Sequence, residues 1–478
     1  MRKLRSILST LGVVGLTCCF SVAYAQEWGA APSPYETPTY YPVSNYSANV
    51  SVDGLASDIE YLKKELAKKS DKPDPKKGFT APRIGGRVFI DSVNILNQSS
   101  DGLPVPLSDT NPGYDGRNFW GFREARLAAT GTAYDFLDYK LELGFEGTSA
   151  DAINFKDVFL GIKSVPLFGY VRIGNQYVED GGSEICNGST NYTFMEMPAP
   201  TGGQFTSRRL GISSRHLFAN DRGRLFLGAY GARSVADTRQ QRFDNQGYML
   251  NARLTHAPLF KNEGKQMFLY GGYYNFTDPS GSGPQGYIRV RPGGYNLDMD
   301  NAFGAGSSIP TTGVHKAGFE TVYQNGAFCL QTDFYLKHFS DAVVGAKTDD
   351  ATLYGGFVMG RYFLTRGAYR KYSLESAAWS SVAVNCPVLL SERGAYNFIQ
   401  GSGVWEVAAY YGFLNNDDFK EIVPYGTDHE IGVALNWYWN PQLKWALNYV
   451  HQVVDITTTD GKARPNTDVL GVSCRFHW

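Results

Sequence analysis

The last ten residues of the chain, VLGVSCRFHW (469–478), decide the fold. Their apolar members, Leu470, Val472, Cys474, Phe476 and Trp478, alternate with residues that are mostly small, polar or charged. A period of two residues is that of a β-strand with one apolar face, because successive side chains of a strand point to opposite sides of the sheet. The chain therefore ends on an amphipathic strand that closes with an aromatic residue.

The same period appears in several earlier stretches, most clearly in residues 139–146, 170–177, 405–412 and 443–449. In each stretch one face carries aliphatic and aromatic residues and the other carries small, polar or charged ones. Such a strand suits lipid on one side and water on the other. Counting from the strand near Arg87, alternation predicts about sixteen strands.

Composition points to the same class of protein. The chain is rich in Tyr (31), Phe (29) and Gly (53). After the N-terminal region it has no run of roughly 20 apolar residues, which excludes transmembrane helices. A soluble sandwich or propeller can also alternate, but it gives no reason for a terminal aromatic strand. We therefore expect an all-β fold, an antiparallel transmembrane β-barrel. The 45 basic and 46 acidic residues nearly cancel, so no nucleic-acid partner is expected.

Residues 1–25 have the form of a signal peptide. Arg2, Lys3 and Arg5 precede a mostly apolar stretch, and Ala23-Tyr24-Ala25 is a small-x-small cleavage site. A lipoprotein signal at Cys18 or Cys19 fits less well, because neither cysteine follows a good lipobox. Cleavage after Ala25 leaves 42 basic and 46 acidic residues. The expected route is export to the periplasm, followed by insertion into the bacterial outer membrane.

Two segments separate this signal from the barrel, which we place at residues 83–478. Residues 26–50 are rich in Pro and Tyr and predict a disordered arm. Residues 51–72 predict a short periplasmic coiled coil, with a 3-4 spaced seam of Val52, Leu55, Ile59, Leu62 and Leu66. An amphipathic helix without a partner is the alternative, because two heptads are marginal alone.

Connection lengths alternate as an outer-membrane barrel requires. Long polar links are predicted near residues 96–117, 178–207, 234–246, 277–312, 339–352, 414–428 and 455–467. Short turns alternate with them, at residues 164–166, 220–221, 324–326 and 440–441. Residues 366–399 break the pattern, because a short periplasmic turn is expected there and the segment is long.

From Arg83 onward the sequence resembles the phosphate-selective porin O and P family. Short pieces in a shared order carry the resemblance: Gly85-Gly86-Arg87, Phe122-Arg123-Glu124-Ala125, Asp138-Tyr139-Lys140-Leu141-Glu142, Phe155-Lys156-Asp157, Val171-Arg172-Ile173-Gly174, Phe194-Met195-Glu196, Arg208-Arg209-Leu210-Gly211, Arg289-Val290-Arg291-Pro292, Phe363-Leu364-Thr365, Trp405-Glu406-Val407-Ala408 and residues 432–438. The resemblance implies a trimeric, sixteen-stranded porin with loops folded into the pore, and it accommodates the long link at 366–399.

The resemblance also supplies the candidate pore-lining residues, which are Arg123, Glu124, Asp157, Glu196, Arg208, Arg289 and Arg291. Guanidinium groups can replace the hydration of a phosphate in a narrow pore. Solvated mouth residues are the alternative reading of the arginines, and a structural network is the alternative for Asp157 and Glu196.

Several positions depart from the phosphate-specific pattern. Glu124 stands where a second arginine is expected, Ile185 where a loop lysine is expected, and Met197 and Gly293 where arginines are expected. An acid beside Arg123 is expected to pair with it and cancel its field. High-affinity phosphate binding is therefore not expected.

The leading hypothesis is passive diffusion of small hydrophilic solutes with a weak preference for anions. A phosphate- or polyphosphate-selective channel is the alternative. A structural protein that tethers the envelope through its N-terminal segments is a second one, and it requires that deleting residues 26–75 detach the envelope without changing permeability. No catalytic, metal or cofactor motif is apparent, so no enzyme and no cofactor are expected.

Overall fold

A computed structural model describes residues 78–99, 118–146, 153–202, 204–233, 247–279, 309–344, 347–392, 395–398, 401–419, 425–458 and 461–478. The signal peptide, arm and coiled coil predicted for residues 1–72 lie outside the described residues.

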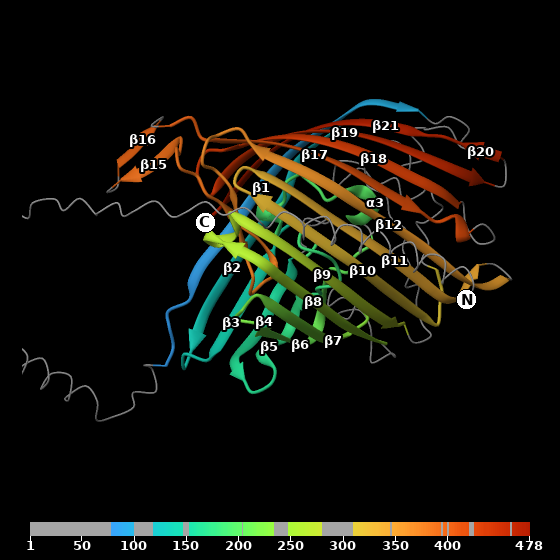
Figure 1. Ribbon diagram of the computed structural model, residues 1–478, viewed down its shortest axis with the longest axis horizontal. Helices are drawn as coiled ribbons and strands as arrows, with labels where there is room; N and C mark the ends of the chain where they lie inside the picture. Colours follow the sequence, from blue (N-terminus) through green and yellow to red (C-terminus); the bar gives the residue numbers. More distant parts are fainter. Residues whose placement is uncertain are drawn as a thin grey trace, which may run out of the picture. The chain divides into compact units, whose positions relative to one another are not determined.

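Sixteen strands of the described residues form one closed antiparallel wall (Figure 1). They are β1 (Arg83–Ser99), β2 (Phe119–Ala133), β3 (Leu137–Gly144), β4 (Asn154–Val165), β5 (Gly169–Tyr177), β6 (Arg208–Phe218), β7 (Gly223–Gly231), β8 (Tyr248–Lys261), β9 (Gln266–Asp278), β10 (Gly313–Asn325), β11 (Phe328–Val344), β12 (Lys347–Phe363), β17 (Val404–Asn415), β18 (Tyr425–Tyr438), β19 (Leu443–Thr458) and β21 (Asn466–His477). The predicted all-β, sixteen-stranded barrel is confirmed.

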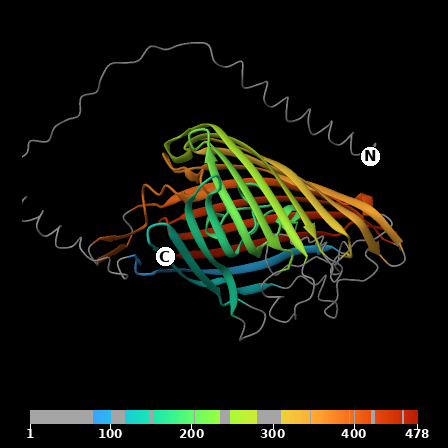
Figure 2. The ribbon, with the colours of Figure 1, turned by 90° about the horizontal axis from the view of Figure 1, so that it is seen from below.

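The first and last strands close the wall. β1 pairs with β2 on one side and with β21 on the other, from Arg87 opposite His477 to Ser99 opposite Asn466 (Figure 2). Next to the Arg87–His477 pair, the Gly86 N–H donates to the Trp478 carbonyl at 3.2 Å, and the Trp478 N–H donates to the Gly86 carbonyl at 3.0 Å. The terminal aromatic strand thus forms the seam of the barrel.

Exposure follows the predicted alternation. Phe145, Ile173, Tyr411 and Phe476 have large exposed side chains, as lipid-facing residues must. Polar side chains on the opposite face are buried inside the wall: among them are Glu142, Gln176, Glu406, Lys444, Asn448, Ser473 and Arg475. Within the described ranges, no helix has the length and apolar content needed to cross a membrane.

The two ends of the barrel differ. One end carries short turns at residues 134–136, 166–168, 219–222, 326–327 and 439–442, and it faces the periplasm by the general architecture of such barrels. At the extracellular end, two predicted long links prove to be mostly strand. β11 continues to Val344 and β12 begins at Lys347. β19 continues to Thr458, where the short β20 (Gly461–Ala463) pairs with it. Strand ends that project beyond the membrane contain the same polar residue types as loops. The sequence pattern therefore predicted links where the structure has strands.

The long periplasmic link contains two hairpins, and we call residues 366–398 the insert. Its first hairpin pairs β13 (Arg370–Ser373) with β14 (Ala378–Val382). Its second pairs β15 (Leu389–Glu392) with β16 (Ala395–Phe398), and it projects at the end where the chain terminates (Figure 1). The insert therefore replaces one turn with a folded segment.

The seam depends on a glycine. A Cβ at position 86 would lie 2.5 Å from the Trp478 ring and 2.7 Å from the backbone carbonyl of Arg126. Gly86→Val should therefore destabilise the barrel by roughly 1–3 kcal/mol, the usual cost of overpacking. The measurement is the temperature at which the purified protein loses its compact form on a semi-native gel. Gly360→Val is the control, because a Cβ there would meet no atom within 4 Å. Equal effects of the two variants would contradict the packing argument.

Candidate functional site

The long segment between β5 and β6, residues 178–207, folds into the barrel, and we call it the inner loop. It contains a 3₁₀ turn, η1 (Ser189–Asn191), and a single helical turn, α3 (Ala199–Gly202), which lies beside β12, β17 and β18 (Figure 1). Ile185, Phe194 and Met195 are at most 2% exposed. Since connecting loops usually run over a protein surface, such burial shows that this one lies inside the wall.

Backbone groups of the inner loop are held by carboxylates at the middle of β10 and β11. The Gly182 N–H donates to Asp333 Oδ2 at 2.7 Å, and the Ser183 N–H donates to Glu320 Oε2 at 2.6 Å. Lys316 on β10 also forms an ion pair with Asp180 of the loop. These contacts fix the inner loop near the middle height of the barrel, where it narrows the lumen.

Glu179 anchors the start of the inner loop. Its carboxylate contacts Arg224 at 2.7 Å and Arg253 at 3.3 Å. Burial alone would raise the pKa of Glu179, but the two guanidinium groups outweigh it and lower the pKa to about 2. The anchor therefore stays charged across the physiological pH range.

The first hairpin of the insert enters the same lumen from the periplasmic end. Its backbone carbonyls accept hydrogen bonds from the wall: Arg224 Nε donates to Glu375 at 2.7 Å and Arg253 donates to Ala377 at 2.8 Å. The Trp379 indole N–H donates to Gln331 at 2.9 Å. The insert is therefore bound to the inner wall.

The insert and the inner loop also bind each other. Asn191 Nδ2 of the loop donates to the Trp379 carbonyl at 3.1 Å, and Arg370 of the insert donates to the Asn191 carbonyl at 2.8 Å. The hydroxyls of Tyr372 and Ser183 lie 2.7 Å apart. Together the two segments cover the inner faces of β8 to β12 and β17 to β19.

Charged side chains on the remaining part of the wall form one connected network, which we call the charged strip. It comprises Arg87 on β1, Glu124 and Arg126 on β2, Lys140 and Glu142 on β3, Glu146 two residues beyond the end of β3, Lys156 and Asp157 on β4, and Arg208 on β6. Its ion pairs join Arg87 to Glu124 (2.5 Å) and Glu142 (2.9 Å), Arg126 to Glu124 (3.0 Å) and Glu146 (2.7 Å), Lys140 to Glu142 (2.7 Å) and Asp157 (2.7 Å), Lys156 to Glu146 (2.9 Å), and Arg208 to Asp157 (2.6 Å).

Two β-bulges raise the charge density of the strip. The pairing of β1 with β2 shifts so that Phe89 opposes Glu124 and Ile90 opposes Phe122, which leaves Arg123 as the extra residue. A bulge lets two consecutive residues face the same side of a sheet. Arg123 and Glu124 can therefore both point into the lumen, while Phe122 is exposed on the outside.

The second bulge lies between β3 and β4. Leu141 opposes Val158 and Leu143 opposes Phe155, so that the two residues between Phe155 and Val158 face one residue of β3. Those two residues, Lys156 and Asp157, both join the charged strip. In each bulge a consecutive charged pair replaces the single polar residue that alternation would allow.

The inner loop closes the charged strip from the other side. Arg123 forms an ion pair with Glu196 of the loop, and Ser189 Oγ donates to Glu124 at 2.8 Å. The expectation that Glu124 pairs with its neighbour Arg123 is wrong. The ion pairs of Glu124 are with Arg87 and Arg126, whereas Arg123 turns to Glu196 of the inner loop.

The structure thus brings five predicted site residues together, namely Arg123, Glu124, Asp157, Glu196 and Arg208. Arg289 and Arg291 lie outside the described residues. Sequence reasoning did not name as site residues Arg87, Arg126, Lys140, Glu142, Glu146 and Lys156. The signal that could have found the bulges is a change of phase: the apolar positions shift from Trp120 and Phe122 to Leu127 across a charged pair.

Two positions at which the resemblance predicts cations lie in an apolar cluster instead. Ile185 is fully buried with Phe194, Phe357 and Met359, and Met197 packs against the same cluster. These side chains stabilise the inner loop against the wall.

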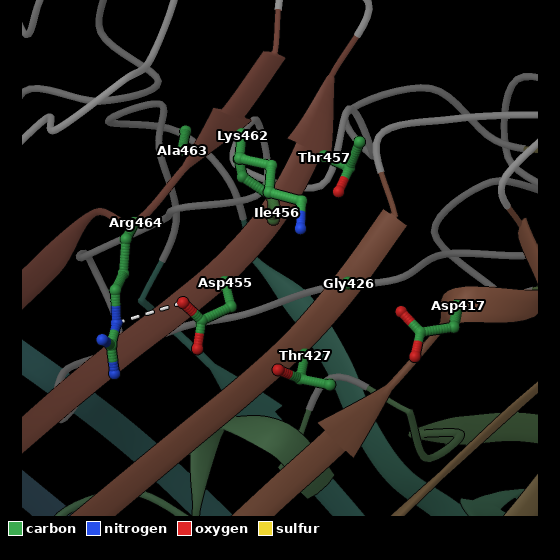
Figure 3. Close-up of a pocket in the computed structure, with 9 residues that line it drawn as sticks. All are labelled: Asp417, Gly426, Thr427, Asp455, Ile456, Thr457, Lys462, Ala463 and Arg464. Carbon is green, nitrogen blue, oxygen red and sulfur yellow. Dashed lines mark ion pairs between the residues drawn. The ribbon is translucent and has the colours of Figure 1, made fainter.

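A hollow of about 610 Å³ lies at the extracellular end, beside the ends of β18 and β19 (Figure 3). Asp455 and Arg464 form an ion pair across it at 3.0 Å. Its lining takes residues from both faces of these strands, because Thr427 and Asp455 alternate with the buried Gly426 and Ile456. Among the residues described, no three His, Cys, Asp or Glu side chains are placed to hold a metal ion.

Comparison with solved structures finds weakly similar barrels. An anion-selective porin from Comamonas acidovorans has 14% identity and a TM-score of 0.47, with 83% of this chain and 99% of that chain covered. The outer membrane channel DcaP of Acinetobacter baumannii has 12% identity and a TM-score of 0.49, with 84% and 98% covered. The trimer form of OmpT from Vibrio cholerae has 11% identity and a TM-score of 0.45, with 83% and 99% covered.

No curated protein matches the chain. The family model described as phosphate-selective porin O and P matches residues 107–478, which include every barrel strand except β1. That match covers far more than half of the sequence and agrees with the sixteen-stranded wall and its inward loop. The chain belongs to the phosphate-selective porin O and P family.

Proposed function

We propose that this outer-membrane porin lets small hydrophilic solutes diffuse passively and favours anions weakly. The observation that carries the proposal is the charged strip facing the inner loop. The basic side chains of the strip, with Arg123, are 9–25% exposed, whereas basic side chains bound by the inner loop and the insert, such as Arg224, Arg253 and Lys316, are at most 4% exposed. The path for solutes therefore runs along β1 to β6.

The preference for anions is weak because the cations of the charged strip are paired with carboxylates. Among the described residues, the strip and the Arg123–Glu196 pair hold six cations and five carboxylates, and each cation has a carboxylate partner within 3.0 Å. Paired charges largely cancel beyond a Debye length of about 8 Å. A single excess positive charge gives a small preference for anions.

A phosphate-selective channel is the second candidate, and membership of the family favours it. Phosphate selectivity requires guanidinium or ammonium donors that are available to the solute. In the charged strip those donors are used by Glu124, Glu142, Glu146 and Asp157. The candidate therefore depends on Arg289 and Arg291, which lie outside the described residues.

A homotrimer in the outer membrane is part of the proposal, because porins of this size are typically trimeric and the family resemblance implies it. The coiled coil proposed for residues 51–72 would then bring three copies together on the periplasmic side. Envelope tethering through residues 26–72 is a further alternative for those segments.

The first prediction from the transport proposal concerns ion selectivity. Glu124→Gln should remove one negative charge from the strip while Arg87 keeps Glu142 and Arg126 keeps Glu146 as a partner. The anion-to-cation permeability ratio should rise about two- to fivefold, since an ion pair of this kind is worth roughly 0.5–1 kcal/mol. The measurement is the reversal potential of single channels in a planar bilayer under a salt gradient. Glu263→Gln is the matched control, because Glu263 pairs with Lys371 at the periplasmic end and is 63% exposed. An unchanged permeability ratio in Glu124→Gln would show that the charged strip does not line the path of the solutes.

A second prediction separates the two transport candidates. Chloride conductance should persist when phosphate is added at millimolar concentration, because the arginines of the strip are already paired. The measurement is single-channel conductance in chloride before and after addition, with sulfate at equal ionic strength as the control. Block by phosphate alone would favour the selective channel over the general one.

A third prediction concerns the insert. Replacing residues 370–382 with a short glycine-serine link should raise single-channel conductance and admit larger sugars in liposome swelling, because the inner loop loses its partner and part of the lumen empties. Replacing residues 389–398, the second hairpin, is the control of similar length. Equal conductance of the two variants would show that the first hairpin does not narrow the pore.

A further inference from the structure

A small pocket lies at the periplasmic end of the lumen, where three segments meet. It is formed by β14 of the insert, the η1 turn of the inner loop, and the periplasmic ends of β18, β19 and β21. Its lining residues include Thr190, Arg370, Ser380, Ser381, Lys444 and Arg475. Its volume is about 20 Å³. The pocket is separate from the charged strip and from the extracellular hollow.

The pocket is rich in positive charge. Arg370, Lys444 and Arg475 line it, and the lining contributed by the described residues includes no carboxylate. All three residues are at most 5% exposed. Arg370 has a carboxylate partner, Glu406, at 3.2 Å behind the pocket.

The other two cations lack such a partner in the part of the chain that the structure describes. Lys444 Nζ donates to the Tyr192 carbonyl at 2.7 Å. Arg475 donates to the carbonyls of Ser189 at 3.0 Å and Met195 at 2.5 Å. Its Nε donates to Ser473 Oγ at 3.1 Å, and that hydroxyl donates to the Asp91 carboxylate at 2.5 Å, so Asp91 is one hydroxyl away.

Neutral carbonyls do not neutralise a buried cation. Ions removed from water are ordinarily matched by an ion of opposite sign, because the desolvation cost is otherwise large. One polar atom of a lining residue is also unsatisfied: within the described residues, the buried Arg370 Nε has no hydrogen-bond partner. The site therefore offers donors and positive charge to something negative.

We propose that this pocket binds one small inorganic anion, chloride being the abundant candidate. A water molecule needs roughly 10–15 Å³ of such space, so the pocket has room for one small ion and excludes a sugar phosphate or nucleotide. Hydroxyls of Thr190, Ser380 and Ser381 supply donors beside the cations. The anion joins the insert to the tip of the inner loop, and this inference does not depend on which solutes the pore conducts.

Bromide tests the proposal, because it substitutes for chloride and scatters anomalously. Crystals of the full mature protein in detergent, grown with sodium bromide in place of chloride, should show an anomalous peak in the pocket. Ser381→Asp should abolish the peak by placing a carboxylate at the site, without removing a cation that holds the inner loop. Ser402→Asp is the matched control, since Ser402 lies at the same end of the barrel but does not line the pocket.

Peaks in the parent protein and in Ser402→Asp, with loss in Ser381→Asp, would support the proposal. Absence of a peak in the parent protein would overturn it. A peak that persists in Ser381→Asp would also overturn it, because an anion held by the charge of the pocket is expelled by an added carboxylate. The persisting peak would then mark an adventitious ion only. The diffraction maps themselves show whether the barrel and inner loop stay folded, and bilayer conductance tests the porin function separately.

Discussion

The closed ring of backbone hydrogen bonds is the constraint on which the rest of the molecule depends. In lipid no water satisfies an open strand edge, so a sheet that spans a membrane must pair its first strand with its last. Here β1 meets β21 over a register from Arg87 to Ser99, and Gly86 and Trp478 extend the seam by two more hydrogen bonds. Because the outer face of the closed wall contacts lipid, polar side chains of the strands must point into the interior.

That interior is divided by two segments that enter it from opposite ends. The inner loop comes from the extracellular end and the insert from the periplasmic end, and wall arginines such as Arg224 and Arg253 hold them. One side of the lumen becomes as tightly packed as a protein core. The other side keeps the partly exposed ion pairs, and this asymmetry is what turns a wide cylinder into a narrow, charged passage.

The sequence predicted the wall better than the interior. A period of two residues depends only on neighbours in the chain, so strands ending at residues such as Trp478 could be recognised, and so could the faces of residues such as Phe145 and Glu142. A bulge shifts the alternation by one residue. Alternation alone therefore does not predict whether the side chain of Arg123 faces the lumen or the lipid. Strand ends that project beyond lipid carry polar residues, which is why Val344 was expected in a loop.

The partners within the interior could not be predicted, for a different physical reason. Ion pairs such as Arg208 with Asp157 join side chains from strands that are not neighbours in sequence, and their identities depend on the registers of several strands at once. The inward position of Ile185 depends on packing against β12 and β17. Family resemblance singled out five residues that the structure brings together, whereas adjacency in the sequence suggested the wrong partner for Glu124.

The joining of the inner loop to the insert has a consequence for how the barrel assembles. Ser183 and Tyr372, whose hydroxyls meet in the lumen, are 189 positions apart in the chain. Contacts between such distant parts form late, because the intervening chain must first be ordered. The wall can therefore reach its correct pairing before the inner loop and the insert meet, and a failure of that last step would leave a well-formed wall around a wrongly packed interior.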